Sequence, residues 1–272
     1  INDVLIVNKR EVFRFPKNDW GAEDLWQEAK CLDLLREYVD ILLPVWTIYA
    51  EDKINYPFIS YKRIPGTALR REHILHLSEA DQDKLAAQLG TLLQTMHNIP
   101  LEAVQSRGIG PSLTNRTAEK WWQLYEDVQH ELFPHLQQFA RAWIEEHFTP
   151  LLADPGWMDG PQTFMNGDLG PYHLLYDPDK GLLNGIIDFG TAGIGDPAAD
   201  FACLLNQYGE GFVRRIGRTY RGIEALIERA RFWAGTLELQ WTLAGLRNPD
   251  DPSWFMVHIG RAHDISPLGS GW

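Results

Sequence analysis

The first part of the chain reads as short strands and one helix. Two runs rich in β-branched and aromatic residues, DVLIV (3–7) and EVFRF (11–15), are separated by three residues, and this spacing predicts a β-hairpin. Apolar residues then recur every three or four positions from Leu25 to Leu35, which predicts an amphipathic helix. Further strand-like runs follow at 45–50 and 57–64. This pattern predicts a small, β-rich lobe.

The pattern changes at Pro65–Gly66, where a turn signal separates the strand-rich part from a mostly helical remainder. Helical spacing of apolar residues recurs further on, at 78–96, with Ser78 as the N-cap, at 117–133, at 137–148 and up to about residue 247. The chain after residue 254 looks partly irregular, and 264–272 reads as a frayed tail. We therefore expect an α+β protein with a small lobe at 1–64 and a large, mainly helical lobe at 65–272.

One predicted hairpin in the large lobe brings chemically active side chains together. The segments HLLY and LLNGIID flank the turn signal DPDKG, so they should pair as antiparallel strands with His173 roughly opposite Ile186. Asp168 precedes the first strand and Asp188 ends the second, which places both carboxylates at one end of the hairpin. Carboxylates suit Mg²⁺, which binds one or two of them together with water and substrate phosphates, whereas histidine is a less usual ligand for this ion. Taken singly, each residue could equally be a turn, cap or strand residue.

Composition narrows the possible partners. The chain has 272 residues, of which 44% are hydrophobic and 23% charged, as in an ordinary globular protein. A formal net charge of −12 argues against nucleic-acid binding and would favour a cationic substrate. Two cysteines cannot form a disulfide framework, and no apolar run approaches the roughly 18 residues of a membrane span. We expect a monomeric, cytoplasmic protein that binds neither nucleic acid nor membrane.

Two motifs together resemble a known family. NGDLGPYHLLYD and GIIDFGTAGIGDPAADFA are similar to the catalytic loop and the metal-binding loop of the aminoglycoside phosphotransferases. The first motif most resembles that of the 2″-phosphotransferases, in which a histidine replaces the usual asparagine. The resemblance spans most of the chain, including FRFPK and YPFISYKRIPG, and implies a two-lobed protein-kinase-like fold. It also implies transfer of the γ-phosphoryl group of ATP or GTP to a hydroxyl group, first of all that of an aminoglycoside.

The resemblance assigns roles to the hairpin residues. Asp168 corresponds to the catalytic-loop aspartate that orients or deprotonates the acceptor hydroxyl. His173 and Asp188 correspond to the Mg²⁺ ligands. Phosphoryl transfer needs positioning and charge neutralisation more than covalent chemistry, so one carboxylate faces the acceptor while another holds the metal ion. Asp196 and Asp200, in GDPAADF, are expected to act as structural hydrogen-bond acceptors.

In the small lobe, the resemblance implies a nucleotide site. Arg14 stands where kinases carry the lysine that pairs with phosphates, with Lys17 as the alternative. Glu28 matches the helix glutamate that orients this cation, with Glu23 as the alternative. The hinge that binds the purine edge is expected in SYKRI, and its candidate residues are Ser60, Tyr61, Lys62 and Ile64. ATP and GTP both stay open as donors.

The sequence also departs from the family pattern. Asn166 stands where the family usually has the histidine of HGD. The phosphate-covering loop and its preceding strand are expected upstream of Ile1, so the small lobe would lack them as given.

The acceptor site has no motif of its own. A polycationic acceptor calls for carboxylates, and the candidates are Glu210 and Glu238, the latter in a helix flanked by tryptophans that include Trp241. Because a fold does not fix its acceptor, other hydroxylated small molecules stay open, namely a macrolide, a choline-like alcohol or homoserine. A nucleotide-binding pseudokinase that serves as a scaffold is the alternative from another class.

Overall fold

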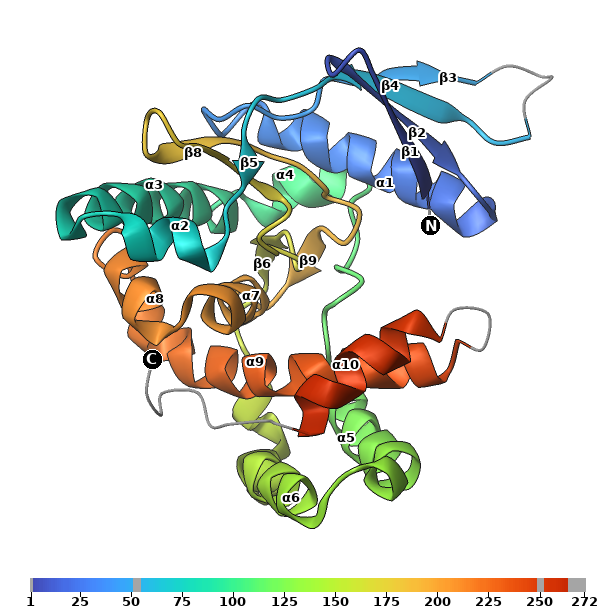
Figure 1. The fold of residues 1–272 in the computed structure, drawn as a ribbon, viewed down its shortest axis with the longest axis vertical. Coiled ribbons are helices and arrows are strands. Elements are labelled where there is room, and N and C mark those ends of the chain that lie inside the picture. Colours follow the sequence, from blue (N-terminus) through green and yellow to red (C-terminus); the bar gives the residue numbers. More distant parts are fainter. Residues whose placement is uncertain (1, 51–54, 249–251, 264–272) are drawn as a thin grey trace.

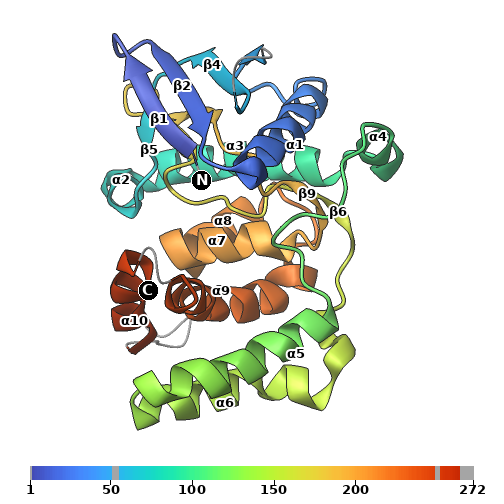
Figure 2. The same cartoon turned by 90° about the vertical axis from the view of Figure 1, so that its right-hand side faces the viewer.

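The structure is a computed structural model and describes residues 2–50, 55–248 and 252–263. Within these ranges, a small lobe of antiparallel strands and one helix lies above a larger, mainly helical lobe (Figure 1). The predicted two-lobed α+β architecture is thus confirmed. Seen from the side, the helices of the large lobe are layered beneath the small one, with α7 above α9 and α9 above α5 and α6 (Figure 2).

The small lobe is built on a four-stranded sheet with the order β1-β2-β4-β3 in the described residues. Its elements are β1 (Asn2–Val7), β2 (Glu11–Pro16), α1 (Asp19–Leu35), β3 (Thr47–Tyr49) and β4 (Phe58–Lys62). The predicted first hairpin is present, with Leu5 opposite Phe13. The helix α1 begins where the Asn18 side chain accepts a hydrogen bond from the Gly21 N–H, and it buries the apolar stripe that its spacing predicts. Strands and helix therefore follow their local sequence closely.

The large lobe consists mainly of helices around two small sheets. Its elements are β5 (Thr67–Ala68), α2 (Arg71–His76), α3 (Glu79–His97), α4 (Leu101–Ser106), α5 (Ala118–Asp127), the π-helical turn η1 (Val128–Leu132), the 3₁₀ turn η2 (Phe133–His135), α6 (Gln138–Ala153), the 3₁₀ turn η3 (Pro155–Met158), β6 (Thr163–Met165), β7 (Leu174–Asp177), β8 (Leu182–Ile186), β9 (Gly193–Gly195), α7 (Ala198–Tyr208), α8 (Glu210–Ile216), α9 (Ile223–Leu246) and α10 (Ser253–His263). Ser78 caps α3 as predicted, because its side chain accepts a hydrogen bond from the Asp81 N–H. No helix in the described part of the chain is both long and apolar enough to cross a membrane.

One predicted element is wrong. The chain after residue 254 continues as the helix α10 instead of an irregular segment. Its exposed face carries apolar residues such as Met256 and Val257, so it lacks a clear polar–apolar pattern. The helix is stabilised by packing on α9, where His258 and Arg261 both bond to Glu238. The predicted frayed tail at 264–272 lies outside the described residues.

The hairpin β7–β8 differs from its predicted register by one residue. The first pairs after the turn follow the expected register, with Tyr176 opposite Leu183. A bulge then adds Asn184 to β8, so Leu174 pairs with Ile186. His173 therefore lies opposite Ile187, whose N–H donates to the His173 carbonyl oxygen at 3.0 Å.

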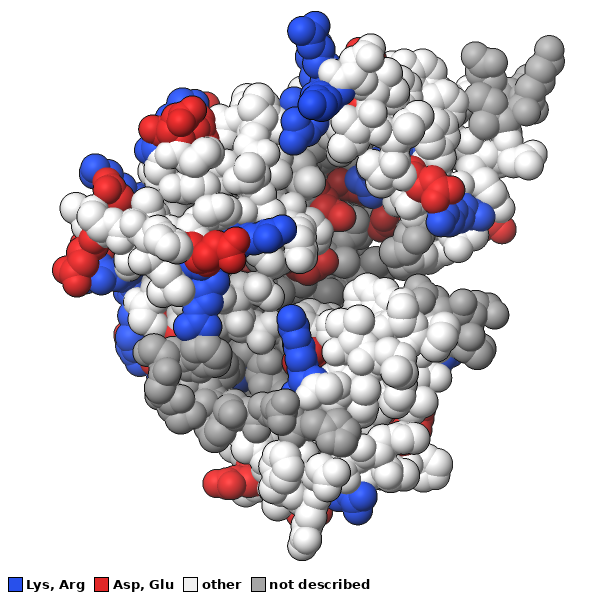
Figure 3. All heavy atoms as spheres, viewed as in Figure 1, with Lys and Arg blue, Asp and Glu red and all other residues white. Residues whose placement is uncertain are grey.

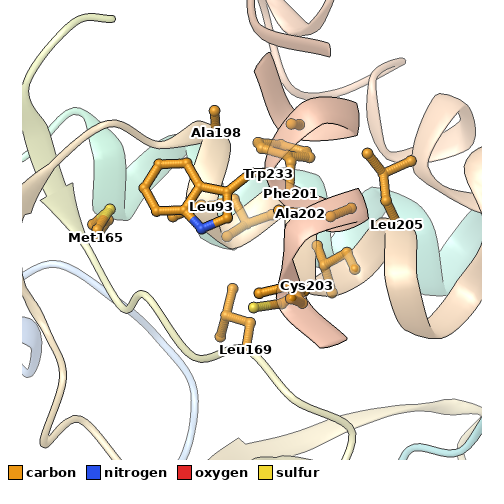
Figure 4. Close-up of a cluster of buried hydrophobic side chains, with 14 of the residues drawn as sticks. Leu93, Met165, Leu169, Ala198, Phe201, Ala202, Cys203, Leu205 and Trp233 are labelled. Atoms are coloured by element: carbon orange, nitrogen blue, oxygen red, sulfur yellow. The ribbon is translucent and has the colours of Figure 1, made fainter. Parts of the chain in front are cut away.

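Buried apolar side chains anchor the loop that precedes this hairpin. Met165 and Leu169 flank the loop on either side and are almost fully buried. They point into a cluster formed by α7 residues, including Phe201 and Cys203, and by Trp233 of α9 (Figure 4). Because interiors are close-packed, this cluster fixes the two ends of the loop and thereby the direction of the residues between them.

Candidate functional site

A cleft of about 860 Å³ separates the two lobes. Its charged lining residues are Arg14 and Asp24 from the small lobe and Asp168 and Asp188 from the large one. Figure 3 shows this hollow between the lobes, with acidic and basic side chains gathered inside it. The catalytic hairpin therefore opens onto the cation that the small lobe supplies.

Asn166 joins the two loops that carry the cleft carboxylates. It is fully buried, and its side-chain oxygen accepts a hydrogen bond from the Asp168 N–H at 2.9 Å. Its side-chain nitrogen donates to the Asp188 carbonyl oxygen at 3.0 Å. The sequence marked this residue only as a departure from a motif, and its bridging role depends on contacts 22 positions apart.

Asp200 fixes the backbone of the loop that begins at Asn166. Its buried carboxylate accepts hydrogen bonds from the N–H groups of Asn166 at 3.1 Å and Gly167 at 2.6 Å. The His97 ring lies 3.0 Å from the same carboxylate. Asp196 accepts from the Ala198 N–H and pairs with Arg229. The predicted role of both aspartates as structural acceptors is confirmed.

His173 is oriented by the catalytic loop. Its Nδ1 lies 2.7 Å from the Asp168 carbonyl oxygen, and since a carbonyl only accepts, Nδ1 must carry the proton. In the form without a proton on Nε2, the ring presents the lone pair of this atom, which lies 3.6 Å from Asp188 Oδ2. Asp188 itself has a φ of 66°, a left-handed conformation that aspartate tolerates better than most residues. A strained backbone at this point is typical of functional sites.

The two facing acceptors suit a divalent cation. A lone pair and a carboxylate oxygen at 3.6 Å repel each other unless a positive charge lies between them. An octahedral ion with ligands at about 2.1 Å separates neighbouring ligand atoms by about 3 Å, so a small adjustment would admit Mg²⁺. A histidine ligand commonly donates its other ring N–H to a carbonyl, as His173 does. No cluster of three or more His, Cys, Asp or Glu residues within the described ranges is arranged to hold a metal, so water and phosphates would complete the shell.

The electrostatics of Asp168 favour proton transfer. Burial raises the pKa of its carboxyl above the ordinary value, His173 opposes this shift, and Asp188 and Asp200 add to it. A carboxylate with a raised pKa is a stronger base, which is what a group that accepts a hydroxyl proton needs.

The small lobe contributes an ion pair. Arg14 Nη1 lies 2.8 Å from Glu28 Oε2, so the predicted pair is present, whereas Lys17 forms an exposed pair with Asp3. The other oxygen of Glu28 accepts the Phe189 N–H at 3.1 Å, which ties α1 to the loop that follows β8. Burial raises the pKa of Glu28 to about 7, although the Arg14 guanidinium pulls it down.

The four predicted hinge residues differ in whether they line the cleft. Tyr61 lines the cleft, but in the described residues the other three candidates do not. The Ser60 hydroxyl lies 3.3 Å from the Tyr49 hydroxyl, Lys62 is exposed, and Ile64 is buried. Tyr61 is thus the one residue of this set in the described lining of the cleft, and the binding of a purine edge by backbone groups of the hinge stays a prediction.

The acceptor candidates lie elsewhere. Glu210 is paired with Arg214 at 2.8 Å and Arg231 at 2.6 Å. Glu238 is paired with His258 at 2.7 Å, and Trp241 packs on the same histidine. None of the three predicted residues is among the described residues that line the cleft.

Two tryptophans that the sequence reasoning missed do line the cleft. Trp20 lies at the start of α1 and Trp254 at the start of α10, and they are 48% and 49% exposed. Their only sequence signal is a large aromatic residue in the first turn of a helix, and α10 was not expected.

Comparison with known proteins identifies a family. Residues 1–233 match the sequence profile described as the phosphotransferase enzyme family. Viomycin phosphotransferase of Streptomyces vinaceus is 28% identical over 201 residues, which span 72% of this chain and 66% of that protein. The GDP complex of aminoglycoside 2'-phosphotransferase-IIIa superposes with a TM-score of 0.85 at 28% identity, covering 97% of this chain and 88% of the other. The GDP and kanamycin complex of APH(2″)-IIia gives the same score and identity over 97% and 89%. These superpositions confirm the two-lobed, protein-kinase-like fold.

Proposed function

Because the chain belongs to the phosphotransferase enzyme family, we propose that it transfers the γ-phosphoryl group of ATP or GTP to a hydroxyl group of an aminoglycoside. The observation that carries this proposal is the convergence of Asp168, His173 and Asp188 on the cleft that Arg14 faces. This arrangement separates a proton-accepting carboxylate from a second one that is free for a cation.

Each residue has a distinct role in the proposal. Arg14, held in place by Glu28, binds phosphate oxygens of the donor, because a guanidinium can bind two of them at once. Asp168 orients the acceptor hydroxyl and accepts its proton. His173 and Asp188 would hold Mg²⁺, which when bound neutralises charge on the phosphates. Since all these groups come from one chain, the enzyme is proposed to act as a monomer.

Two findings support the choice of substrates. The related structures are complexes with GDP and with GDP and kanamycin, so a guanine nucleotide is tested beside ATP. In this chain, Trp20 and Trp254 approach the cleft from opposite lobes and offer flat apolar surfaces against which sugar rings can pack. Viomycin is the second candidate acceptor, because the viomycin phosphotransferase is 28% identical to this chain.

The proposal is tested by direct assay. The protein is incubated with ATP or GTP, Mg²⁺ and, separately, kanamycin, viomycin, a macrolide, choline or homoserine, and product mass and nucleoside diphosphate are measured. Asp168→Asn should lower turnover by about 10²- to 10⁴-fold, the usual contribution of a general base, with nucleotide affinity unchanged. Asp179→Asn removes the same charge from the turn of the same hairpin and should leave turnover intact.

Two outcomes would count against it. Nucleotide binding without transfer to any acceptor would instead favour a scaffold. Transfer to homoserine or a macrolide alone would retain the phosphotransferase and replace the acceptor.

A further inference from the structure

A second cavity lies beside the cleft and has a different charge. It has a volume of about 270 Å³ and is lined by residues of α5 and α9 and by Arg116, which precedes α5. We name it the basic pocket, because its charged lining residues are Arg116, Lys120, Arg247 and Asp127. Ala244 lines both cavities, so the basic pocket adjoins the wall of the cleft.

Two of its cations form no ion pair within the described residues. Arg247 is neutralised by Asp127 at 2.7 Å and by Glu131. Among the residues that the structure describes, neither Arg116 nor Lys120 has a carboxylate partner. In a chain with a net charge of −12, two cations that share one cavity and form no ion pair in the described structure require an explanation.

Neutral groups hold Arg116 in position. Its Nε and Nη2 donate to the Gln240 side-chain oxygen at 3.2 Å and 2.7 Å. Gln240 is itself fixed, because its nitrogen donates to the Thr236 hydroxyl at 2.8 Å. The guanidinium also lies over the Trp121 ring, 5.4 Å from its centroid. The donor fork is therefore oriented before any ligand arrives.

The burial of Arg116 carries an energetic cost that these neighbours offset only in part. Burial lowers the pKa of its guanidinium, and only the Coulomb attraction of Asp127 opposes this shift. A neutral amide and an aromatic face stabilise a cation less than a charged partner does. An anion bound in the basic pocket would supply the missing charge and form charge-assisted hydrogen bonds with both cations.

We propose that the basic pocket binds an anionic group, a phosphate or a carboxylate of a small molecule, through the Arg116 guanidinium and the Lys120 ammonium group. Gln240 holds Nε and Nη2 of Arg116, so the directional contact comes from Nη1, which forms no hydrogen bond within the described residues. Lys120 adds a mobile charge, since its only hydrogen bond in the described structure is a long one of 3.4 Å to the Asn115 carbonyl. The site does not depend on the identity of the phosphoryl acceptor.

The test is equilibrium binding of inorganic phosphate and of citrate, measured by titration calorimetry on the full chain. Arg116→Gln should weaken binding about tenfold or more, as expected for a hydrogen bond to a charged group. Lys120→Gln should weaken it about threefold, because an exposed charge contributes less. Arg14→Gln removes the cation of the nucleotide cleft, and Arg221→Gln removes a charge from the exposed surface; both should leave binding at this site unchanged.

The controls decide between the possible outcomes. Loss of binding in Arg14→Gln but not in Arg116→Gln would place the anion in the nucleotide cleft and overturn the proposal. Absence of saturable binding of either probe would overturn it as well. Binding of phosphate alone would identify a phosphate site, and binding of both probes would extend it to carboxylates. If Arg116→Gln fails to fold, Lys120→Gln still decides, since Lys120 is exposed and its replacement disturbs no packing.

Discussion

At the scale of single residues, the buried side chain of Asn166 fixes the positions of two loops. Besides its two side-chain bonds to the catalytic loops, its N–H donates to Asp200 and its carbonyl oxygen accepts from the Thr191 hydroxyl at 2.9 Å. Every polar group of the residue is therefore satisfied in the interior, where an unmet one is costly. The side chain fixes the separation between Asp168, the proposed proton acceptor, and Asp188, the proposed metal ligand.

Asn166→Ala should weaken both stability and catalysis. The change leaves the Asp168 N–H and the Asp188 carbonyl oxygen without their buried partner, so we expect the free energy of unfolding to fall by about 2 kcal/mol. Turnover should fall at least about tenfold, because the two carboxylates lose their common support. Urea unfolding and steady-state kinetics check both effects. A variant with wild-type turnover would show that the loop keeps its geometry without this bridge.

At this scale, local spacing predicts some partners and misses others. The Arg14–Glu28 pair was predicted from the family resemblance, because spacing alone left Lys17 and Glu23 as alternatives. Glu210 also pairs with Arg214 four residues on, but its bond to Arg231 and the bond of Glu238 to His258 join residues 21 and 20 positions apart, on helices whose packing the pattern does not encode. A free acidic side chain and a neutralised one look identical in a sequence.

The helix α1 links the sheet of the small lobe to the loop that follows β8 in the large one. One carboxylate, that of Glu28, bonds to Arg14 on one side and to the Phe189 N–H on the other. Because this group is fully buried, its ionisation is coupled to the stability of the fold.

Glu28→Gln should flatten the pH dependence of stability. Burial raises the pKa of Glu28 to about 7 in the folded protein, against an ordinary value of 4.5 in the unfolded chain. The folded state therefore binds more protons between these values, and its free energy of unfolding falls as pH rises from 4.5 to 7, by about 3 kcal/mol. Urea unfolding of both proteins from pH 4.5 to pH 8 measures the difference. If the wild type instead gains stability over the variant as pH rises, attraction to Arg14 outweighs burial.

At the scale of the whole molecule, the lobes are joined by backbone contacts at the bulge of β8. The Leu42 N–H donates to the Asn184 carbonyl oxygen at 3.3 Å, and the Ile186 N–H donates to the Leu42 carbonyl oxygen at 3.1 Å. The Asn184 side chain donates to the Pro65 carbonyl oxygen at 2.8 Å. The sequence pattern predicted two lobes but not this junction, because its backbone–backbone hydrogen bonds join groups more than 140 positions apart, which hydrophobic periodicity does not encode.

Gly185→Ala should loosen this junction. A Cβ at this position would lie 2.6 Å from Ile64 Cγ2 and 2.8 Å from the Leu42 carbonyl oxygen, so the backbone of one lobe must move. Overpacking of this kind costs about 1–3 kcal/mol of stability, and the nucleotide KM should rise as the lobes separate. Gly211→Ala is the control, because its Cβ meets nothing within 4 Å and alanine favours the helix there. Equal unfolding midpoints for the two variants would show that the junction accommodates the added methyl group with no loss of stability.

The backbone character of this junction has a consequence for evolution. The Leu42 side chain is 49% exposed and takes no part in the hydrogen bonds that join the lobes. Substitutions at this position can therefore drift without altering how the lobes meet. Selection on the junction acts instead on Gly185, because a methyl group at this position would collide with Ile64 and with the Leu42 carbonyl oxygen.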